Sequence, residues 1–221
     1  RALDQIVELF PRLQERLRAE ALRAVAHASA NDACLDDFFR HLPFFLRQME
    51  SDNAEVMTAT TMILGNIARR DDTCIKLVDG GILATLTRLL SHKDERIIHL
   101  ALGGIRNLAI PAPNKPKVAA TGVLSNCTAL LKHRNALVQY AAIGVIKVLV
   151  NGGEQFARQW ISEEGAVSTL SALVIKGPGG ENELVAGGER VQYEGARVLA
   201  TLCANKDWCR QVADANGAEA L

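Results

Sequence analysis

A recurring segment constrains the fold of this 221-residue chain more than any single motif does. Alignment on the "IRNLA" stretch brings together "ALRAVA" from Ala21, "ILGNIA" from Ile63, "GIRNLA" from Gly104, "VIKVLV" from Val145 and "LATLCA" from Leu199. In the first, second and fourth segments, the position that corresponds to Asn107 is taken by Ala24, Asn66 and Lys147. From one segment to the next, these positions are 42, 41 and 40 residues apart. A period near 40 residues is typical of helical solenoids.

The last spacing is longer, because Thr201 takes the slot in the fifth segment, 54 residues after Lys147. The glycine-rich stretch "GPGGENELVAGG", Gly177 to Gly188, accounts for the excess as a long connection inside the repeat. We therefore divide the chain into approximate repeats at residues 1–29 (partial), 30–70, 71–113, 114–151, 152–205 and 206–221 (partial). The chain lacks an initial Met and ends where a further helix begins, so we expect it to be a fragment of a longer solenoid.

Within a repeat the pattern indicates three helices. A short one, "TCIKLVD", ends at the glycine pair before Ile82; "ILATLTRLLS" has one apolar face; and "RIIHLALGGIRNLAI" is apolar nearly all round until Pro111 and Pro113 stop it. One such unit cannot bury its own apolar face, but stacked neighbours can. The prediction is an all-α, right-handed superhelical solenoid with three helices per repeat and about five repeats.

Composition narrows the function classes. The chain is 48% hydrophobic with zero formal net charge, which is typical of a soluble protein and gives no basic surplus for nucleic acid. Its longest apolar stretch, Leu137 to Val150, is interrupted by Gln139 and Lys147, so we expect no membrane insertion. The five cysteines have no C-x-x-C spacing and no phosphate-binding glycine loop is present, so we expect no metal, cofactor or catalytic residues.

The third helix, with an Asn just before its end, resembles the armadillo repeat. Three stretches resemble more closely the family of smg GTPase-GDP dissociation stimulators: "DDTCIKLVDGGI" from Asp71, "IIHLALGGIRNLAIPAPNKPKV" from Ile97 and "LVQYAAIGVIKVLV" from Leu137. This resemblance implies a cytoplasmic protein that binds Rho, Rap and Ras type GTPases, particularly those with a basic, prenylated tail. It implies nucleotide exchange for some of them and a chaperone role in trafficking; we expect a monomer.

The resemblance also implies a binding surface, since the Asn of an armadillo third helix faces a concave groove. Residues four and eight positions earlier share its helix face. The predicted partner-binding residues are Asn66, His99, Gly103, Asn107, Gln139, Ile143, Lys147, Tyr193, Arg197 and Thr201. An Asn amide both donates and accepts, so it can hold another chain's backbone. The alternative that Asn107 caps the carbonyls of its own or a neighbouring helix stays open.

The predicted rows contain Lys147 and Arg197 but no acidic residue, which favours contact with the folded GTPase body or an acidic surface over a basic tail. A rival prediction is a peptide-binding adaptor of the β-catenin or importin-α kind. Importin-like grooves hold Lys stems with a Trp four residues before the Asn; this chain has Met62, Gly103, Ile143 and Arg197 there, which argues against a nuclear-localisation receptor. A third possibility is a structural segment whose partner binds elsewhere.

Overall fold

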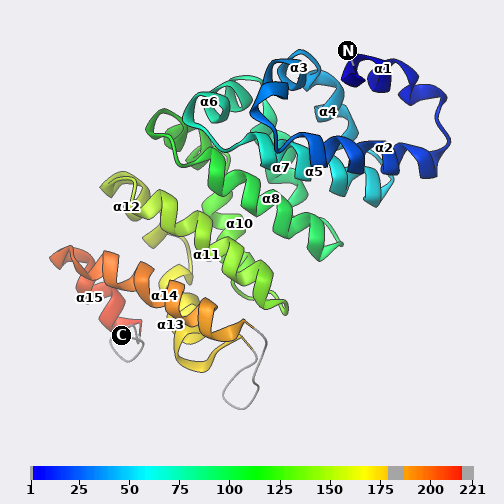
Figure 1. Cartoon of the computed structure of the whole chain (residues 1–221). Coiled ribbons are helices and arrows are strands. Elements are labelled where there is room, and N and C mark those ends of the chain that lie inside the picture. The colour runs from blue at the N-terminus through cyan, green and yellow to red at the C-terminus, as the bar shows by residue number, and fades with distance from the viewer. Residues whose placement is uncertain (1, 179–186, 216–221) are drawn as a thin grey trace. The chain divides into compact units, whose positions relative to one another are not determined.

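The computed structural model describes residues 2–178 and 187–215, and these residues form only helices and their connections (Figure 1). The chain divides into two compact units, Arg1–Asn114 and Lys115–Leu221, which are described separately. Most of the predicted glycine-rich connection, residues 179–186, lies outside the described part. No helix among the described residues combines the length and apolar character that crossing a bilayer requires.

Unit 1 contains two complete three-helix repeats after an N-terminal pair of helices. Its elements are α1 (Ala2–Leu9), η1 (Phe10–Arg12), α2 (Glu15–Ala28), η2 (Asp32–Cys34), α3 (Leu35–Arg40), α4 (Leu42–Gln48), α5 (Ala54–Ile67), α6 (Asp71–Asp79), α7 (Ile82–Leu89), α8 (Glu95–Leu108) and η3 (Ala112–Asn114). The third helices α2, α5 and α8 pack against one another in succession. Leu22, Ile63 and Leu102, one from each, are fully buried or nearly so.

Unit 2 repeats the same order. Its elements are α9 (Lys115–Ala119), α10 (Val123–Leu130), α11 (Ala136–Val150), α12 (Glu154–Ile161), α13 (Ala166–Lys176), α14 (Gly188–Cys203) and α15 (Lys206–Asp214). The third helices α11 and α14 pack together, and α14 also lies against α13 and α15. Trp160 of α12 is fully buried, and its indole N–H donates to Thr128 Oγ1 at 3.1 Å.

In the repeats that follow α5, glycine explains how the first helix turns into the second. Gly81, Gly122 and Gly165 precede α7, α10 and α13 with φ values of +88°, +74° and +72°. Side chains are disfavoured in this left-handed region, so glycine permits an abrupt change of direction there. The structure thus confirms the all-α fold and the three helices per repeat that the sequence predicts.

Candidate functional site: the third helices

A repeated N-cap sets the register of the third helices. Asn53, Asp94 and Asn135 precede α5, α8 and α11, and each side-chain Oδ1 accepts the backbone N–H two residues later at 2.9 Å. These caps lie 41 residues apart. Capping fixes where a helix starts, so residues equally far from the cap occupy equivalent positions.

This register corrects the predicted row on α11 by one residue. Asn66 and Asn107 each lie thirteen residues after their cap, and the same distance from Asn135 leads to Val148 and not to Lys147. Gln139 and Ile143, predicted to line a surface, are only 3% and 0% exposed. Gln139 Nε2 donates to Leu131 O at 3.1 Å, so this side chain closes the turn between α10 and α11.

The half-buried face of α11 carries Tyr140, Gly144 and Val148, which are the cap-aligned equivalents of His99, Gly103 and Asn107. Sequence reasoning missed them because Lys147 was the polar residue available near the helix end. The sequence signal that gives the correct register is the N-cap residue before each third helix. His92 and His133 stand two residues before Asp94 and Asn135, and each accepts the N–H of its cap residue through Nδ1.

In unit 1, the predicted residues Asn66 and Asn107 lie at equivalent positions of α5 and α8, but their side-chain amides have different surroundings. Asn66 Nδ2 donates to Ala26 O and to Ser29 Oγ, both at 3.1 Å, so it joins α5 to the end of α2. No hydrogen bond to the Asn107 side-chain amide occurs in the part of the chain that the structure describes. On the same helix, His99 and Gly103 are half-buried, and a Cβ added at Gly103 would have no atom within 4 Å.

Unit 2 presents an exposed polar row on α14. Tyr193 is 64% exposed, and the Arg197 guanidinium lies 5.7 Å from its ring centre. Thr201 is exposed and donates its hydroxyl to Arg197 O at 2.9 Å. An exposed Tyr with a stacked Arg combines two residue types that are enriched in protein-interface hot spots.

Glu194 corrects the predicted charge of this row. Its carboxylate binds Lys147 Nζ from the neighbouring third helix, and its other oxygen lies 3.5 Å from Arg197 Nη1. The Glu194 side chain is only 14% exposed, so both cations face a partly buried acid that the sequence rows did not include. The sequence signal was its position, three residues before Arg197 on the same helix.

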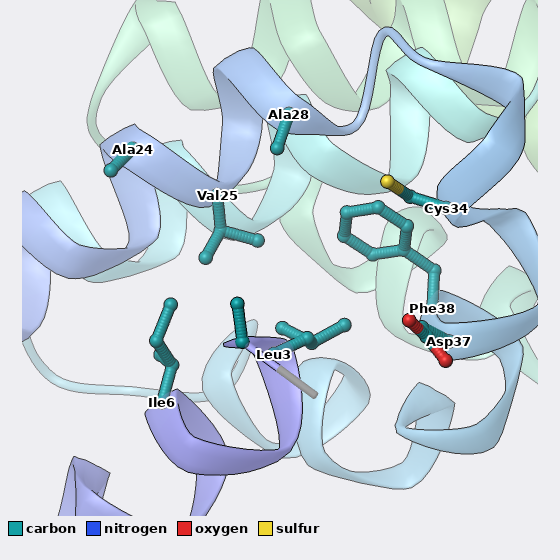
Figure 2. Close-up of a pocket in the computed structure, with 9 residues that line it drawn as sticks. Leu3, Ile6, Ala24, Val25, Ala28, Cys34, Asp37 and Phe38 are labelled. Atoms are coloured by element: carbon teal, nitrogen blue, oxygen red, sulfur yellow. The ribbon is translucent and has the colours of Figure 1, made fainter.

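Cavities adjoin these helices in both units. An open hollow of about 490 Å³ lies among Tyr140, Glu189, Arg190, Tyr193 and Glu194 in unit 2. A second, of about 220 Å³, lies in unit 1 at the ends of α5 and α8. The third, of about 210 Å³, is mainly apolar and lies between α1, α2 and α3; Figure 2 shows Leu3, Ile6, Val25 and Phe38 around it.

A marked pKa shift that bears on reactivity occurs at Cys74 of α6. Burial, and to a smaller extent the nearby carboxylates of Asp71 and Asp72, raise the pKa of this thiol to about 11. Cys74 is therefore protonated near neutral pH and serves as a donor to Asn107 O, at 3.5 Å. No group of three or more potential metal ligands gathers within the described ranges.

Successive three-helix repeats with packed third helices define an armadillo-repeat protein. The chain superposes on a designed armadillo repeat protein in complex with the peptide (KR)4 with a TM-score of 0.84 at 21% identity, covering 99% of this chain and 89% of that one. No family model matches the chain.

Among curated proteins, the chain is similar to GTPase-GDP dissociation stimulators. It is 38% identical to Rap1 GTPase-GDP dissociation stimulator 1-A of Xenopus laevis over 77 residues, 33% of this chain and 13% of that protein. It is 28% identical to the GTPase-GDP dissociation stimulator vimar of Drosophila melanogaster over 188 residues, 76% of this chain and 30% of that protein. The chain thus spans less than a third of the length of these relatives.

Proposed function

We propose that this chain is a binding module for small GTPases that promotes guanine nucleotide release or chaperones the GTPase. The observation that carries the proposal is its similarity to the stimulators from frog and fly. We further propose that the partners are Rho, Rap or Ras type GTPases, that the protein works in the cytoplasm, and that it acts as a monomer without catalytic side chains.

Such a module needs no side-chain chemistry. A protein that binds the nucleotide-free or distorted GTPase more tightly than the nucleotide-bound form shifts the GTPase toward release, by the difference in its affinity for the two states. The third helices offer surfaces suited to this role. His99 and Gly103 lie on α8 in unit 1, and Tyr193, Arg197 and Thr201 lie on α14 in unit 2.

A prenylated tail would require an apolar site. The cavity between α1, α2 and α3 has matching chemistry, because Leu3, Ile6, Val25 and Phe38 surround it (Figure 2). Competition between a farnesylated tail peptide and the unmodified peptide would test this part of the proposal. Equal affinity of the two peptides would remove the lipid from the proposed partner.

The central test is release of a fluorescent guanine nucleotide from Rho, Rap and Ras type GTPases, with and without the protein. We expect accelerated release for at least one of them and reduced acceleration with Arg197→Ala. Binding without acceleration would favour the chaperone role over exchange. Absence of binding to every GTPase in the panel would refute the proposal.

A peptide-binding adaptor is the second candidate. It is favoured by the open hollow in unit 2, where two tyrosines and two glutamates adjoin, and by the (KR)4 complex of the designed armadillo protein. Titration with (KR)4 and with an acidic peptide of equal length distinguishes the charge preference. Tight binding of either peptide, without any GTPase binding, would support the adaptor.

A further inference from the structure

Two free cysteines lie at the corner between the last two helices of unit 2. Cys203 is the last residue of α14, and Cys209 lies in the first half of α15. The corner between them is short and held by hydrogen bonds. Asn205 caps α15 by accepting the N–H of Asp207 through Oδ1 at 2.9 Å, and the Asn205 N–H donates to Leu202 O at 3.0 Å.

This corner turns Cys209 back toward the end of α14. Cys209 is the fourth residue of α15 after the N-cap Asn205, and the side chain at this position of a helix often packs against residues just before the cap. Val212, three positions later on the same helix face, is fully buried. Since α15 packs on α14 and α13, the face that carries Cys209 and Val212 adjoins the preceding helices.

The two thiols contact each other, and their access to solvent differs. Burial, and after it a hydrogen bond with the Cys209 side chain, raise the pKa of the Cys203 thiol above its ordinary value. Cys203 is half-buried, whereas Cys209 is exposed. A reagent from solvent therefore reaches Cys209 first, and Cys203 is close enough to react with the product on the Cys209 sulfur.

The other three cysteines have different settings. Cys74 and Cys127 are 3% and 0% exposed, and burial raises the pKa of both thiols. Because the thiolate is the reactive form of cysteine, these two thiols are inert near neutral pH. Cys34 is half-buried and belongs to unit 1. An exposed thiol with a second thiol beside it is the arrangement found in redox-sensitive cysteine pairs.

We propose that Cys203 and Cys209 form a reversible oxidation site for hydroperoxides, at which a disulfide fastens α15 to the end of α14. In the first step, the Cys209 thiolate attacks the terminal oxygen of the peroxide. An S–O bond forms and the O–O bond breaks, so the sulfur is oxidised to a sulfenic acid. The peroxide is reduced to water or an alcohol, which takes up the thiol proton.

The second step closes the disulfide. The Cys203 sulfur attacks the Cys209 sulfur, the S–S bond forms, the S–O bond breaks, and the hydroxide leaves as water with the Cys203 proton. Two thiols and one hydroperoxide thus yield one disulfide, one water and one further water or alcohol. A thiol reductant reverses the change by exchange, as is usual for regulatory disulfides in reducing compartments.

The disulfide acts on a helix that has little buried surface of its own. Val212 is the buried residue among those of α15, Lys206–Asp214. Closing the short loop from Cys203 to Cys209 restricts the state in which α15 is detached, and so favours the packed helix. The oxidation site does not depend on the proposed function, because none of these steps involves a GTPase.

The first experiment treats the reduced full chain with hydrogen peroxide, alkylates the remaining thiols and maps tryptic peptides by mass spectrometry. Trypsin cleaves after Lys206, so a disulfide links the peptide that ends at Lys206 to the peptide that ends at Arg210. We expect this linked pair in the wild type, its loss after a dithiol is added, and an unchanged yield in the matched control Cys34→Ser. A covalent dimer through Cys209 in place of the linked pair would overturn the proposal.

Single variants test the order of the two steps. In Cys203→Ser, the sulfenic acid on Cys209 should persist and react with dimedone, because no second thiol resolves it. In Cys209→Ser, Cys203 should stay reduced at the same dose of peroxide. Equal dimedone labelling of Cys209 in the wild type and in Cys203→Ser would overturn the proposal, since Cys203 would then not react with the sulfenic acid. Circular dichroism checks that both variants fold.

Hydrogen exchange measures the effect on α15. Oxidation should slow the exchange of the α15 amides by about tenfold and leave the α2 amides of unit 1 unchanged. The double variant Cys203→Ser, Cys209→Ser should show no response of α15 to peroxide. Unchanged exchange of α15 in a sample that contains the linked peptides would overturn the fastening of this helix. Each of these readouts is independent of GTPase binding, so failure here leaves the proposed function intact.

Discussion

Ion pairs join successive third helices in both units, and in unit 1 they are the exposed pairs of Glu55 with Arg23 and Arg96. The units differ in the polar residue that links a third helix to its neighbour further along, toward the end of the helix. In unit 1, the neutral amide of Asn66 links α5 to the carbonyl and hydroxyl groups at the end of α2. In unit 2, Lys147 of α11 and Glu194 of α14 form an ion pair. The comparison teaches that a polar residue near the end of a third helix first serves the contact with the neighbouring repeat.

The units also differ in how tightly glycine lets the helices pack. A Cβ added at Gly195 of α14 would lie 2.6 Å from Val174 Cγ2 and 3.2 Å from Leu170 Cδ1, whereas one at Gly104 of α8 would meet Leu86 at an ordinary 3.6 Å. The tighter contact occurs where the second helix of the repeat is longer: α13 in unit 2 has 11 residues, whereas α7 in unit 1 has 8. Unit 2 thus has less room for change at its third helix than unit 1 has.

The largest expected effect tests this difference in helix packing between the two units. Gly195→Ala should lower the free energy of unfolding of unit 2 by about 2–3 kcal/mol, because Val174 is short, stiff and buried and cannot move aside cheaply. Urea unfolding followed by tryptophan fluorescence measures it, since both tryptophans, Trp160 and Trp208, lie in unit 2.

The matched control is Gly103→Ala in α8, where the added methyl group meets no atom within 4 Å. This substitution should raise the free energy of unfolding of unit 1 by about 0.5–1 kcal/mol through helix propensity alone, and far-UV circular dichroism follows it because both tryptophans lie in unit 2. Equal responses at the two glycines would show that the packing difference between the units has no energetic weight.

Much of the fold could be predicted from the sequence, because the period and the helix ends rest on local chemistry. The short helix predicted at "TCIKLVD" is α6, and the glycine pair after it marks the start of α7 at Ile82. Glycine, proline and capping residues act within one turn, so their effects can be read without knowledge of the tertiary structure.

The candidate site could be predicted only in part. The surface placement of Tyr193, Arg197 and Thr201 agrees with the structure, but the roles of these residues in partner binding stay predictions. Glu194 was missed because its pairing with Lys147 joins residues 47 positions apart. The amide of Asn66 bonds to Ala26 and Ser29 in the preceding repeat, 40 and 37 residues earlier, and the sequence of its own helix does not show these partners.

The next largest effect tests how much the ion pair of Lys147 and Glu194 stabilises unit 2. Glu194→Gln should lower the free energy of unfolding of unit 2 by about 1–2 kcal/mol, because Lys147, with 20% of its side chain exposed, loses its charged partner. A double-mutant cycle with Lys147→Met should recover much of the loss, since the second change removes the unpaired cation.

Arg197→Met is the control for this ion pair. Arg197 is 54% exposed and 3.5 Å from Glu194, so its loss should cost less than about 0.5 kcal/mol. A cost for Arg197→Met equal to that for Glu194→Gln would mean that Glu194 stabilises unit 2 mainly through its pair with Arg197 within α14, and not through its pair with Lys147 of α11.

The smallest expected effect concerns α1 and α15, the first and last described helices, which pack against their units through different contacts. Val212 of α15 is fully buried, whereas α1 has no buried residue. Polar contacts hold α1 beside its half-buried Leu3 and Ile6: Asp4 Oδ1 lies 2.7 Å from His41 Nε2 and 3.5 Å from Arg40 Nη1. The hydrogen bond from His41 is the main cause that lowers the pKa of Asp4 from 3.8 to about 2.

Because the pKa of Asp4 is lowered when α1 is packed in place, the ionised carboxylate stabilises the packed helix at pH values above the ordinary pKa of the group. This stabilisation is lost as the pH falls from about 4 toward about 2. The protection factors of the α1 amides against hydrogen exchange should therefore fall in that window before those of the α15 amides do. In His41→Phe, an NMR titration should show the pKa of Asp4 returning toward 3.8, because the donor is gone. A pKa of Asp4 that stays near 2 in this variant would assign the shift to Arg40 and the chain's other positive groups, and His41 would then play no part in holding α1.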